Sequence, residues 1–84
     1  MDPVELYDML HKQPFEPFRI HLTDGRVFDI RYPKLNMVGV SWVIIGVPVP
    51  NDPDPVADQF IKVPLSLFER VESLPAYQGS FVSF

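Results

Sequence analysis

A short N-terminal helix is the first element that the hydrophobic pattern predicts. Asp2 is a suitable N-cap, Pro3 has the fixed φ of a first helical position, and Glu5 follows the cap by three residues, as in a capping box. Apolar side chains then recur at helical spacing on one face, which comprises Leu6, Tyr7 and Leu10. Pro14 ends the helix after about three turns. A helix this short is marginal alone, so we expect it to pack on a sheet.

Strict alternation of apolar and polar residues predicts a β-hairpin between positions 18 and 32. The apolar positions of its two strands are Phe18, Ile20, Leu22, Phe28, Ile30 and Tyr32. A two-residue turn would oppose Ile20 to Asp29, so that polar and apolar faces would mix. A three-residue loop with Gly25 in the left-handed conformation instead pairs Ile20 with Phe28. Opposite charges then meet on the solvent face, where Arg19 pairs with Asp29.

The rest of the chain predicts three further strands. An apolar run from Val38 to Val47 is too continuous for a strand buried on one face only, so we interpret it as the central strand. We expect Trp42 in the core, and a binding platform is the alternative. Four prolines in residues 48–55 exclude a ladder and indicate an exposed loop. Residues 59–63 and 68–74 form the last two strands, joined by a tight helical turn. The predicted fold class is mainly β: an N-terminal α-helix followed by a five-stranded curled antiparallel sheet.

Composition limits the compartment and the chemistry more than the fold. The 84 residues have room for one domain, which we place at residues 1–74, and 46% hydrophobic residues favour a packed core. The absence of cysteine excludes disulfides, a thiol nucleophile and a thiolate metal site. The N-terminus is acidic without an apolar stretch behind it, and no apolar run approaches the roughly 20 residues that span a bilayer. We therefore expect a cytoplasmic protein with no membrane partner.

The C-terminal tail, residues 75–84, has no clear period but is rich in aromatic residues. Tyr77, Phe81 and Phe84 form its candidate interaction surface. Loose tails are seldom so apolar, which favours docking on the same domain or on a neighbouring molecule. A flexible tail is the alternative that the sequence leaves open.

Catalysis finds no support among the motifs of the sequence. His21 and Asp29 fall on the solvent face of the hairpin, and such a pair is able to move protons, but surface strands commonly carry solvated cross-strand charges. The serines lie in no nucleophile elbow, the glycines form no phosphate-binding loop, and two distant histidines give no zinc pattern. The aspartates of residues 52–58 lack the glycine and the distal glutamate of a calcium loop. We therefore expect no enzyme activity, no metal and no cofactor.

One cluster of basic residues supports a second interpretation, nucleic-acid binding. It comprises Arg19, His21, Arg31 and Lys34, near aromatic residues. The formal net charge of −4 opposes a general attraction to phosphates, although residues 19–34 carry a local excess of positive charge. An ordinary polar sheet face explains the same cluster and is the more frequent case.

An architectural resemblance accompanies these patterns. An N-terminal helix, five short strands and the turn from Leu22 to Arg26, reading LTDGR, resemble the Sm-like and SH3-like small barrels. The resemblance implies a small-barrel architecture, and many Sm-like proteins assemble into rings that bind RNA. The second strand lacks the bending glycine of Sm-like proteins, and residues 60–71 lack their Arg-Gly step. No RNA-contacting residue is therefore carried over.

A closer resemblance lies in the segment from Gln13 to Arg26. It reads QPFEPFRIHLTDGR and is similar to the opening of a family of small uncharacterised bacterial proteins. The similarity covers residues 1 to about 74 and leaves the tail outside. It implies a compact bacterial domain and brings no activity and no site residue.

The function that we expect is a non-catalytic module for protein interaction or self-assembly, with a homo-oligomer or a protein partner. Small size, apolar ends, exposed sheet edges and the missing catalytic motifs favour it. Two alternatives from other classes stay open. One is Sm-like binding of RNA or single-stranded nucleic acid through the sheet face that carries Arg19, His21 and Arg31. The other is an enzyme centred on His21 and Asp29.

Overall fold

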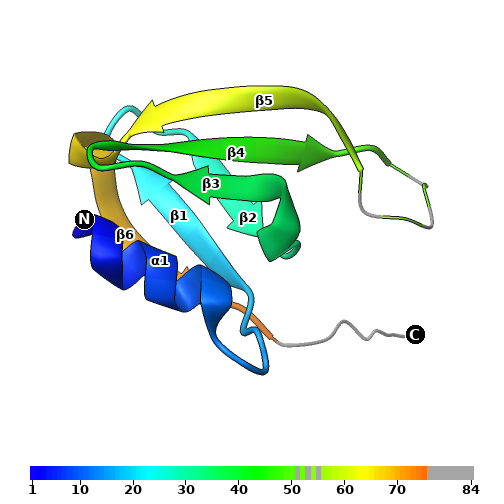
Figure 1. The fold of residues 1–84 in the computed structure, drawn as a ribbon. Helices are drawn as coiled ribbons and strands as arrows, with labels where there is room; N and C mark the ends of the chain where they lie inside the picture. Colours follow the sequence, from blue (N-terminus) through cyan, green and yellow to red (C-terminus); the bar gives the residue numbers. More distant parts are fainter. Residues whose placement is uncertain (51, 53, 55, 76–84) are drawn as a thin grey trace.

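The computed structural model describes residues 1–50, 52, 54 and 56–75, which form one helix and two three-stranded antiparallel sheets (Figure 1). The helix, α1 (Pro3–His11), comes first. Sheet A has the strand order β2-β1-β6 and consists of β1 (Phe18–Leu22), β2 (Val27–Ile30) and β6 (Phe68–Ser73). Sheet B has the order β3-β4-β5 and consists of β3 (Asn36–Val38), β4 (Trp42–Pro48) and β5 (Ala57–Pro64). The chain passes between the sheets at two 3₁₀ turns, η1 (Pro33–Leu35) and η2 (Leu65–Leu67).

The predicted class, mainly β with an N-terminal helix and antiparallel pairing, is confirmed, but the single five-stranded sheet is wrong. Val38 ends β3 and Trp42 begins β4, so the predicted central strand is a hairpin. The N–H of Gly39 donates to the carbonyl of Trp42 over 2.7 Å and closes the turn. A Cβ at Gly39 would lie 2.5 Å from the Trp42 ring, so a glycine is needed beneath the indole. The turn residues Val40 and Ser41 are not a pair typical of hairpin turns, which is why the apolar run concealed the turn.

The predicted helix is confirmed, and its contacts correct the predicted apolar face. The Asp2 side chain caps it, because Oδ1 accepts a hydrogen bond of 2.9 Å from the N–H of Val4. Leu6 and Leu10, four residues apart, are the two buried side chains. Tyr7, which we expected beside them, is 52% exposed and stacks on the exposed ring of His11. The helix therefore inserts a narrow line of two leucines into the core.

The first hairpin has the register that its alternation predicts. Ile20 lies opposite Phe28 and Arg19 lies opposite Asp29. Gly25 has a φ of +93°, in the left-handed region that glycine adopts without steric cost. The three-residue loop is therefore confirmed, and the inward side chains of β1 are all buried.

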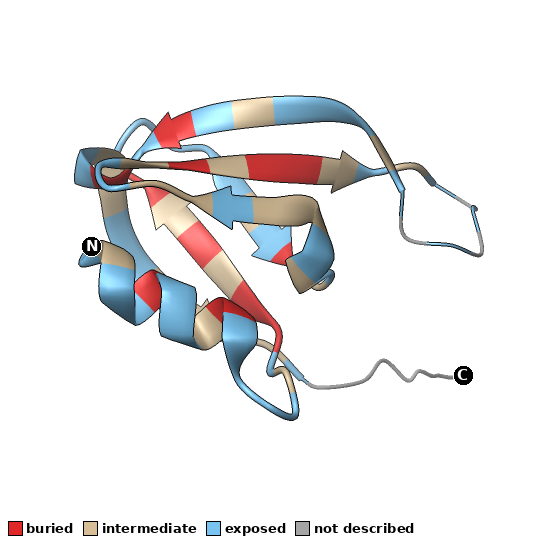
Figure 2. Ribbon diagram, viewed as in Figure 1, coloured by how far each residue is buried: buried red, intermediate tan, exposed pale blue. Residues whose placement is uncertain are grey.

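The core lies between the two sheets and is closed by the helix (Figure 2). Its buried side chains are Leu6, Leu10, Phe18, Ile20, Leu22, Ile30, Val43, Ile45, Val63 and Leu65. They come from α1, from four strands and from η2. Because alternate residues of a strand point to opposite faces, each sheet turns one face to this core and the other to solvent. The two outer faces are where binding side chains can lie.

Candidate functional site

The outer face of sheet A carries most of the charged residues that the sequence singles out. Its charged side chains, here called the polar face, are Arg19, His21, Asp29, Arg31, Glu69, Arg70 and Glu72. The guanidinium of Arg19 donates from Nε to Asp29 Oδ1 over 2.6 Å and from Nη2 to Oδ2 over 3.0 Å. This two-point geometry is the stronger kind of arginine–carboxylate pair. The predicted contact of Arg19 with Asp29 is therefore confirmed.

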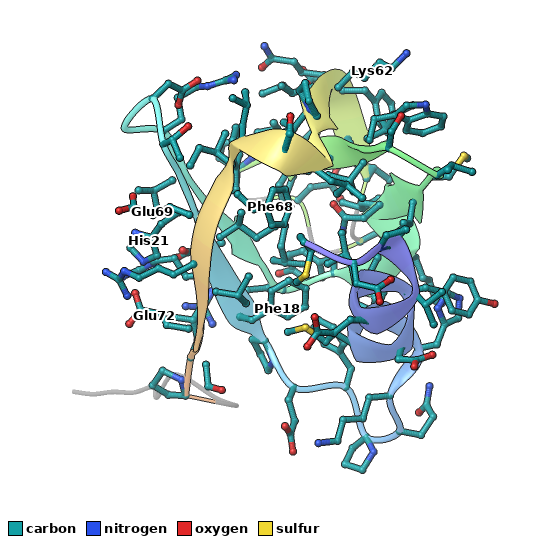
Figure 3. All side chains as sticks on the ribbon, turned by 90° about the vertical axis from the view of Figure 1, so that its left-hand side faces the viewer. Phe18, His21, Lys62, Phe68, Glu69 and Glu72 are labelled. Carbon is teal, nitrogen blue, oxygen red and sulfur yellow. The ribbon has the colours of Figure 1, made fainter. Side chains whose placement is uncertain are left out.

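His21 has a partner on the polar face that the hairpin alone does not supply. Its Nε2 lies 2.6 Å from Oε1 of Glu72, which belongs to β6. Figure 3 shows His21, Glu69 and Glu72 on one side of sheet A, with Phe18 and Phe68 on the other. The hydrogen bond with His21 holds the pKa of Glu72 below its ordinary value of 4.5.

This geometry changes the acid–base pair that the sequence suggests. The carboxylate of Asp29 is occupied by Arg19, and His21 bonds to Glu72 instead. Glu72 lies 51 residues further along the chain, so no local pattern could have found it. A histidine–carboxylate pair is one component of acid–base sites, and here it forms part of a network of charges on a sheet face.

The polar face is balanced in charge. Besides Arg19, it holds Arg31, whose Nη2 lies 3.9 Å from Asp29 Oδ2, and Arg70, whose Nη1 lies 3.8 Å from Glu72 Oε1. With Glu69, three arginines stand against three carboxylates, and the positive charges are already compensated from within the fold. A face of this kind attracts phosphates less than its arginines alone suggest.

The remaining predicted site residues do not join this face. Lys34 lies in η1 and lines a hollow on the outer face of sheet B, together with Met37. The structure thus brings Arg19, His21 and Arg31 together on sheet A and places Lys34 on another surface. The tail residues of the candidate interaction surface, Tyr77, Phe81 and Phe84, lie outside the described residues.

The outer face of sheet B is a surface that the sequence interpretation missed. Its apolar side chains, here called the apolar face, are Leu35, Met37, Trp42, Ile44 and Phe60. Met37 is 62% exposed and Phe60 is 61% exposed, although large apolar side chains are usually turned inward. Four of its five side chains line an open hollow of about 320 Å³, and they are Leu35, Met37, Ile44 and Phe60.

Gly46 is the residue that lets the apolar face close up around this hollow. It lies opposite Phe60 in the ladder. A Cβ there would lie 2.6 Å from the carbonyl oxygen and 2.9 Å from the Cβ of Leu35, and 3.1 Å from the ring of Phe60. Leu35 and Phe60 therefore both lie close over the glycine, which explains its place in a strand of mostly bulky residues.

Trp42 also belongs to the apolar face and not, as we expected, to the core. The buried residues of β4 are Val43, Ile45 and Gly46, whereas the Trp42 side chain is half-buried above Gly39. The ammonium of Lys62 lies 5.1 Å from the centre of its ring, a cation–π distance. The only cation of β5 thus sits beside an aromatic ring at the rim of the apolar face.

The number of helices and strands that the sequence predicts is a signal for the apolar face. A continuous apolar strand needs cover on both faces, and one short helix provides cover for neither outer face here, because Leu6 and Leu10 enter the core between the sheets. A mainly β chain with one helix and an uninterrupted apolar run therefore predicts apolar side chains in solvent.

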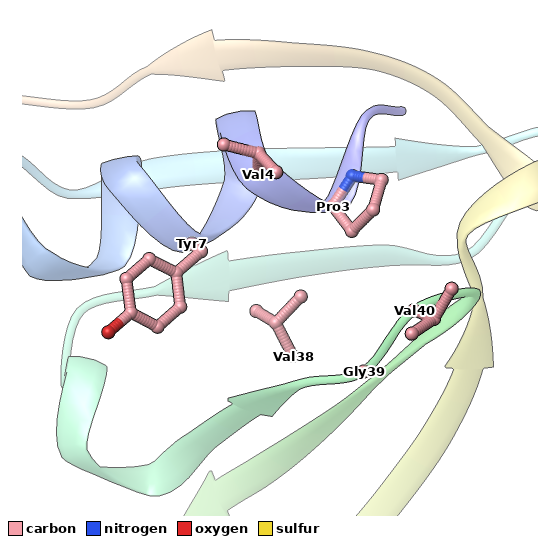
Figure 4. A pocket seen from close by; sticks show the side chains of 6 residues that line it. All are labelled: Pro3, Val4, Tyr7, Val38, Gly39 and Val40. Carbon is pink, nitrogen blue, oxygen red and sulfur yellow. The ribbon is translucent and has the colours of Figure 1, made fainter.

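A second apolar hollow, here called the helix groove, lies between α1 and the β3–β4 turn (Figure 4). Its volume is about 350 Å³, and it is lined by Pro3, Val4, Tyr7, Val38, Gly39 and Val40. Val4 and Val40 are 65% and 87% exposed. Neither this groove nor the hollow of the apolar face includes His21 or Asp29.

Metal and membrane features are absent from the part of the chain that the structure describes. Within residues 1–50, 52, 54 and 56–75, no three histidine or acidic side chains converge as metal ligands would. No helix among the same residues has the length and hydropathy to cross a bilayer. In comparisons with known proteins, neither a family model nor a curated sequence nor a solved structure matches this chain.

Proposed function

We propose that this protein is a non-catalytic module that binds protein through the apolar face of sheet B. The observation that carries the proposal is the exposure of Met37 and Phe60, 62% and 61%, on a surface whose other members are apolar too. Contiguous apolar surface on a small protein is typical of interaction sites. Its burial against a partner would contribute roughly 25 cal/mol per Å² removed from water.

The choice of sheet B over sheet A rests on the state of the side chains. The arginines of the polar face already hold carboxylates, as Arg19 holds Asp29, and a partner would have to compete with these pairs. The side chains of the apolar face have no such competing partners, because apolar groups gain on leaving water against any apolar surface.

We further propose that the two sheets are the halves of an Sm-like or SH3-like small barrel, and that the protein works as a homo-oligomer in the cytoplasm. The two 3₁₀ turns support the barrel interpretation, since η1 and η2 each carry the chain from one sheet to the other around a shared core. The exposed edges of both sheets support self-assembly.

Selection from a displayed library of random peptides tests the binding function. The full chain is immobilised beside a double variant, Met37→Ser with Phe60→Ser. The matched control is Val27→Ser, whose side chain is 49% exposed on sheet A. We expect peptides with aliphatic or aromatic residues that bind the wild type and the control equally. The double variant should lose at least about tenfold in affinity, as for hot-spot side chains.

Two outcomes would contradict the proposal. One is a set of peptides that binds the double variant as tightly as the wild type. The other is the absence of any selected peptide combined with a strictly monomeric protein. Melting curves by circular dichroism verify that all three proteins are folded.

A further inference from the structure

The free edge of β5 is the longest unpaired strand edge among the described residues. Strand β5 runs for eight residues, Ala57–Pro64, and among the described strands it pairs only with β4. An edge of this kind presents a row of backbone N–H and C=O groups to solvent, and natural proteins usually shorten or cover it. Here the edge also presents Phe60, which is 61% exposed.

The alternation of hydrogen-bonded pairs between β4 and β5 shows which residues of β5 direct their backbone groups to the free edge. The N–H of Leu65 donates to the carbonyl of Ser41 over 2.9 Å, one step beyond the pair of Trp42 with Pro64. Bonded and non-bonded pairs alternate in an antiparallel ladder, so the odd-numbered residues of β5 bond to β4. Phe60 and Lys62 then direct their backbone groups outward. Pro64, which has no N–H to give, falls on the same outward side.

The sequence of this edge is complementary to itself. Asp58 and Lys62 lie two residues before and two residues after Phe60, and both are exposed. In an antiparallel pair of identical strands centred on Phe60, Asp58 of each copy comes opposite Lys62 of the partner subunit. Opposite charges thus meet twice, with the two phenylalanines between them. A shift of the centre to Lys62 would instead oppose two lysines.

A bulge near the start of β5 limits the length of this pairing. The β4–β5 register shifts between Val47 and Pro48, which makes Asp58 the additional residue of a bulge. The backbone from Gln59 to Pro64 keeps an even register. A two-fold contact centred on Phe60 keeps Gln59 to Ile61 of both copies in this regular part, and it pairs Lys62 of each copy with Asp58 of the partner subunit, the bulge residue.

We infer that a second copy of this chain binds at the free edge of β5, by antiparallel pairing of the two β5 strands about a two-fold axis at Phe60. The contact is isologous, as in most small homodimers. It joins the two B sheets into one six-stranded sheet, and Phe60 of each copy packs on Phe60 of the partner subunit. The pairing deepens the proposed function and rests on it in one respect, since Phe60 belongs to the apolar face.

Charge reversal at the edge tests the pairing, with self-association measured by sedimentation equilibrium of the full chain. Lys62→Asp places two pairs of like charges across the axis, and we expect the dimer dissociation constant to rise at least about tenfold, because like charges directly opposite destabilise a pair. Asp58→Lys should do the same. The double variant, Asp58→Lys with Lys62→Asp, should recover most of the affinity.

The matched control is Lys12→Asp, an equal change of charge at an exposed lysine at the end of α1, outside sheet B. It should dimerise as the wild type does. The double variant also controls for the loss of the contact between Lys62 and Trp42, because it lacks this contact and is still expected to dimerise.

Three results would overturn the inference. They are a wild-type protein that stays monomeric at high micromolar concentration, a dimer as sensitive to Lys12→Asp as to Lys62→Asp, and a double variant that associates no better than either single variant. A monomer that still selects peptides on the apolar face overturns the pairing and the homo-oligomer, and it leaves protein binding by the apolar face standing. A dimer with the expected charge dependence but without peptide binding supports the pairing and contradicts the binding of peptides by the apolar face.

Discussion

Gly46 and Gly39 show how single residues set the surface of sheet B. Both lie beneath a large side chain, since Cβ positions there come within 3.1 Å of Phe60 and 2.5 Å of Trp42. The absence of a side chain at these positions leaves room for an aromatic ring close to the backbone. Neither glycine has the positive φ of Gly25, so the need is for space rather than for an unusual backbone conformation.

Gly46→Ala should therefore destabilise the protein through a steric clash. The new Cβ would lie 2.6 Å from the carbonyl oxygen of Leu35, so η1 must move, at a cost of about 1–3 kcal/mol. Urea denaturation measures the loss. Ser41→Ala is the control, because Ser41 is an exposed residue of the β3–β4 turn that already carries a Cβ. Equal stability losses in the two variants would show that space above Gly46 is not the cause.

Asp29 links the pH dependence of stability to a single pair. Its pKa lies below the ordinary value of 3.8, chiefly because Arg19 donates a hydrogen bond to the carboxylate. A folded pKa below the unfolded one means that the unfolded state binds the proton more readily. The stabilisation by the Arg19–Asp29 pair is complete at pH values above the unfolded pKa of Asp29, and it is lost as the pH falls through the folded pKa. The pair is about one-third exposed, so the effect is under about 1 kcal/mol.

Asp29→Asn should thus be less stable than the wild type at pH 7 and approach it as pH falls below about 4. Thermal unfolding monitored by circular dichroism across this range provides the comparison. Arg19→Gln should show the same convergence, because it removes the other half of the pair. A stability difference that stays constant from pH 7 to about pH 3 would assign the loss to packing instead.

At the scale of elements, the helix and the hairpin differ in what holds them. The hairpin has a cross-strand register and a positive-φ glycine that specify it locally. Helix α1, with nine residues, is too short to be stable alone, and it depends on its N-cap and on two buried leucines. The stability of the hairpin should therefore depend on its cross-strand register and Gly25, and that of the helix on its cap and its leucines.

Asp2→Ala removes the cap of α1 and should cost about 1 kcal/mol. The carboxylate now accepts the N–H of Val4, and this N–H would be left without its partner in the fold. Denaturant unfolding measures the change. Asp8→Ala is the matched control, since Asp8 is an exposed acidic residue within the helix. The decrease in the free energy of unfolding should be much smaller for this variant. Similar losses in the two variants would contradict the capping argument.

At the scale of the whole molecule, the network of ion pairs and the exposed apolar cluster lie on different sheets. The polar face of sheet A has its arginines paired with carboxylates, and the apolar face of sheet B has its aromatic and aliphatic side chains in solvent. The formal net charge is −4. This separation favours a protein partner over a nucleic acid, because the surface free to gain on binding is the apolar one.

Single-stranded RNA and DNA should consequently bind weakly or not at all. We expect no shift of fluorescence anisotropy for labelled oligonucleotides at about 50 mM salt, a concentration at which phosphate contacts are strong. Binding that weakens steeply with salt and falls with Arg19→Ala plus Arg31→Ala would reverse this expectation. It would establish the nucleic-acid alternative in place of the protein-binding module.

The sequence by itself determined those features of the fold that depend on interactions within a few residues. The cap at Asp2, the alternation from Phe18 to Ile30 and the glycine of the loop act over a few residues, so helix, hairpin and register could be predicted from the chain. Turn chemistry was a weaker guide at Val40, where an apolar residue fills a hairpin turn and one predicted strand became two.

Only the tertiary structure decided which residues meet across the molecule. Glu72 reaches His21 across 51 residues, and Lys34, close to the hairpin in sequence, lies on the other sheet's outer surface. The outward place of Trp42 and Phe60 likewise depends on which face of sheet B the core occupies. Alternation shows that the two faces of a strand differ, but only the packing of the sheets and the helix determines which face stays exposed to solvent.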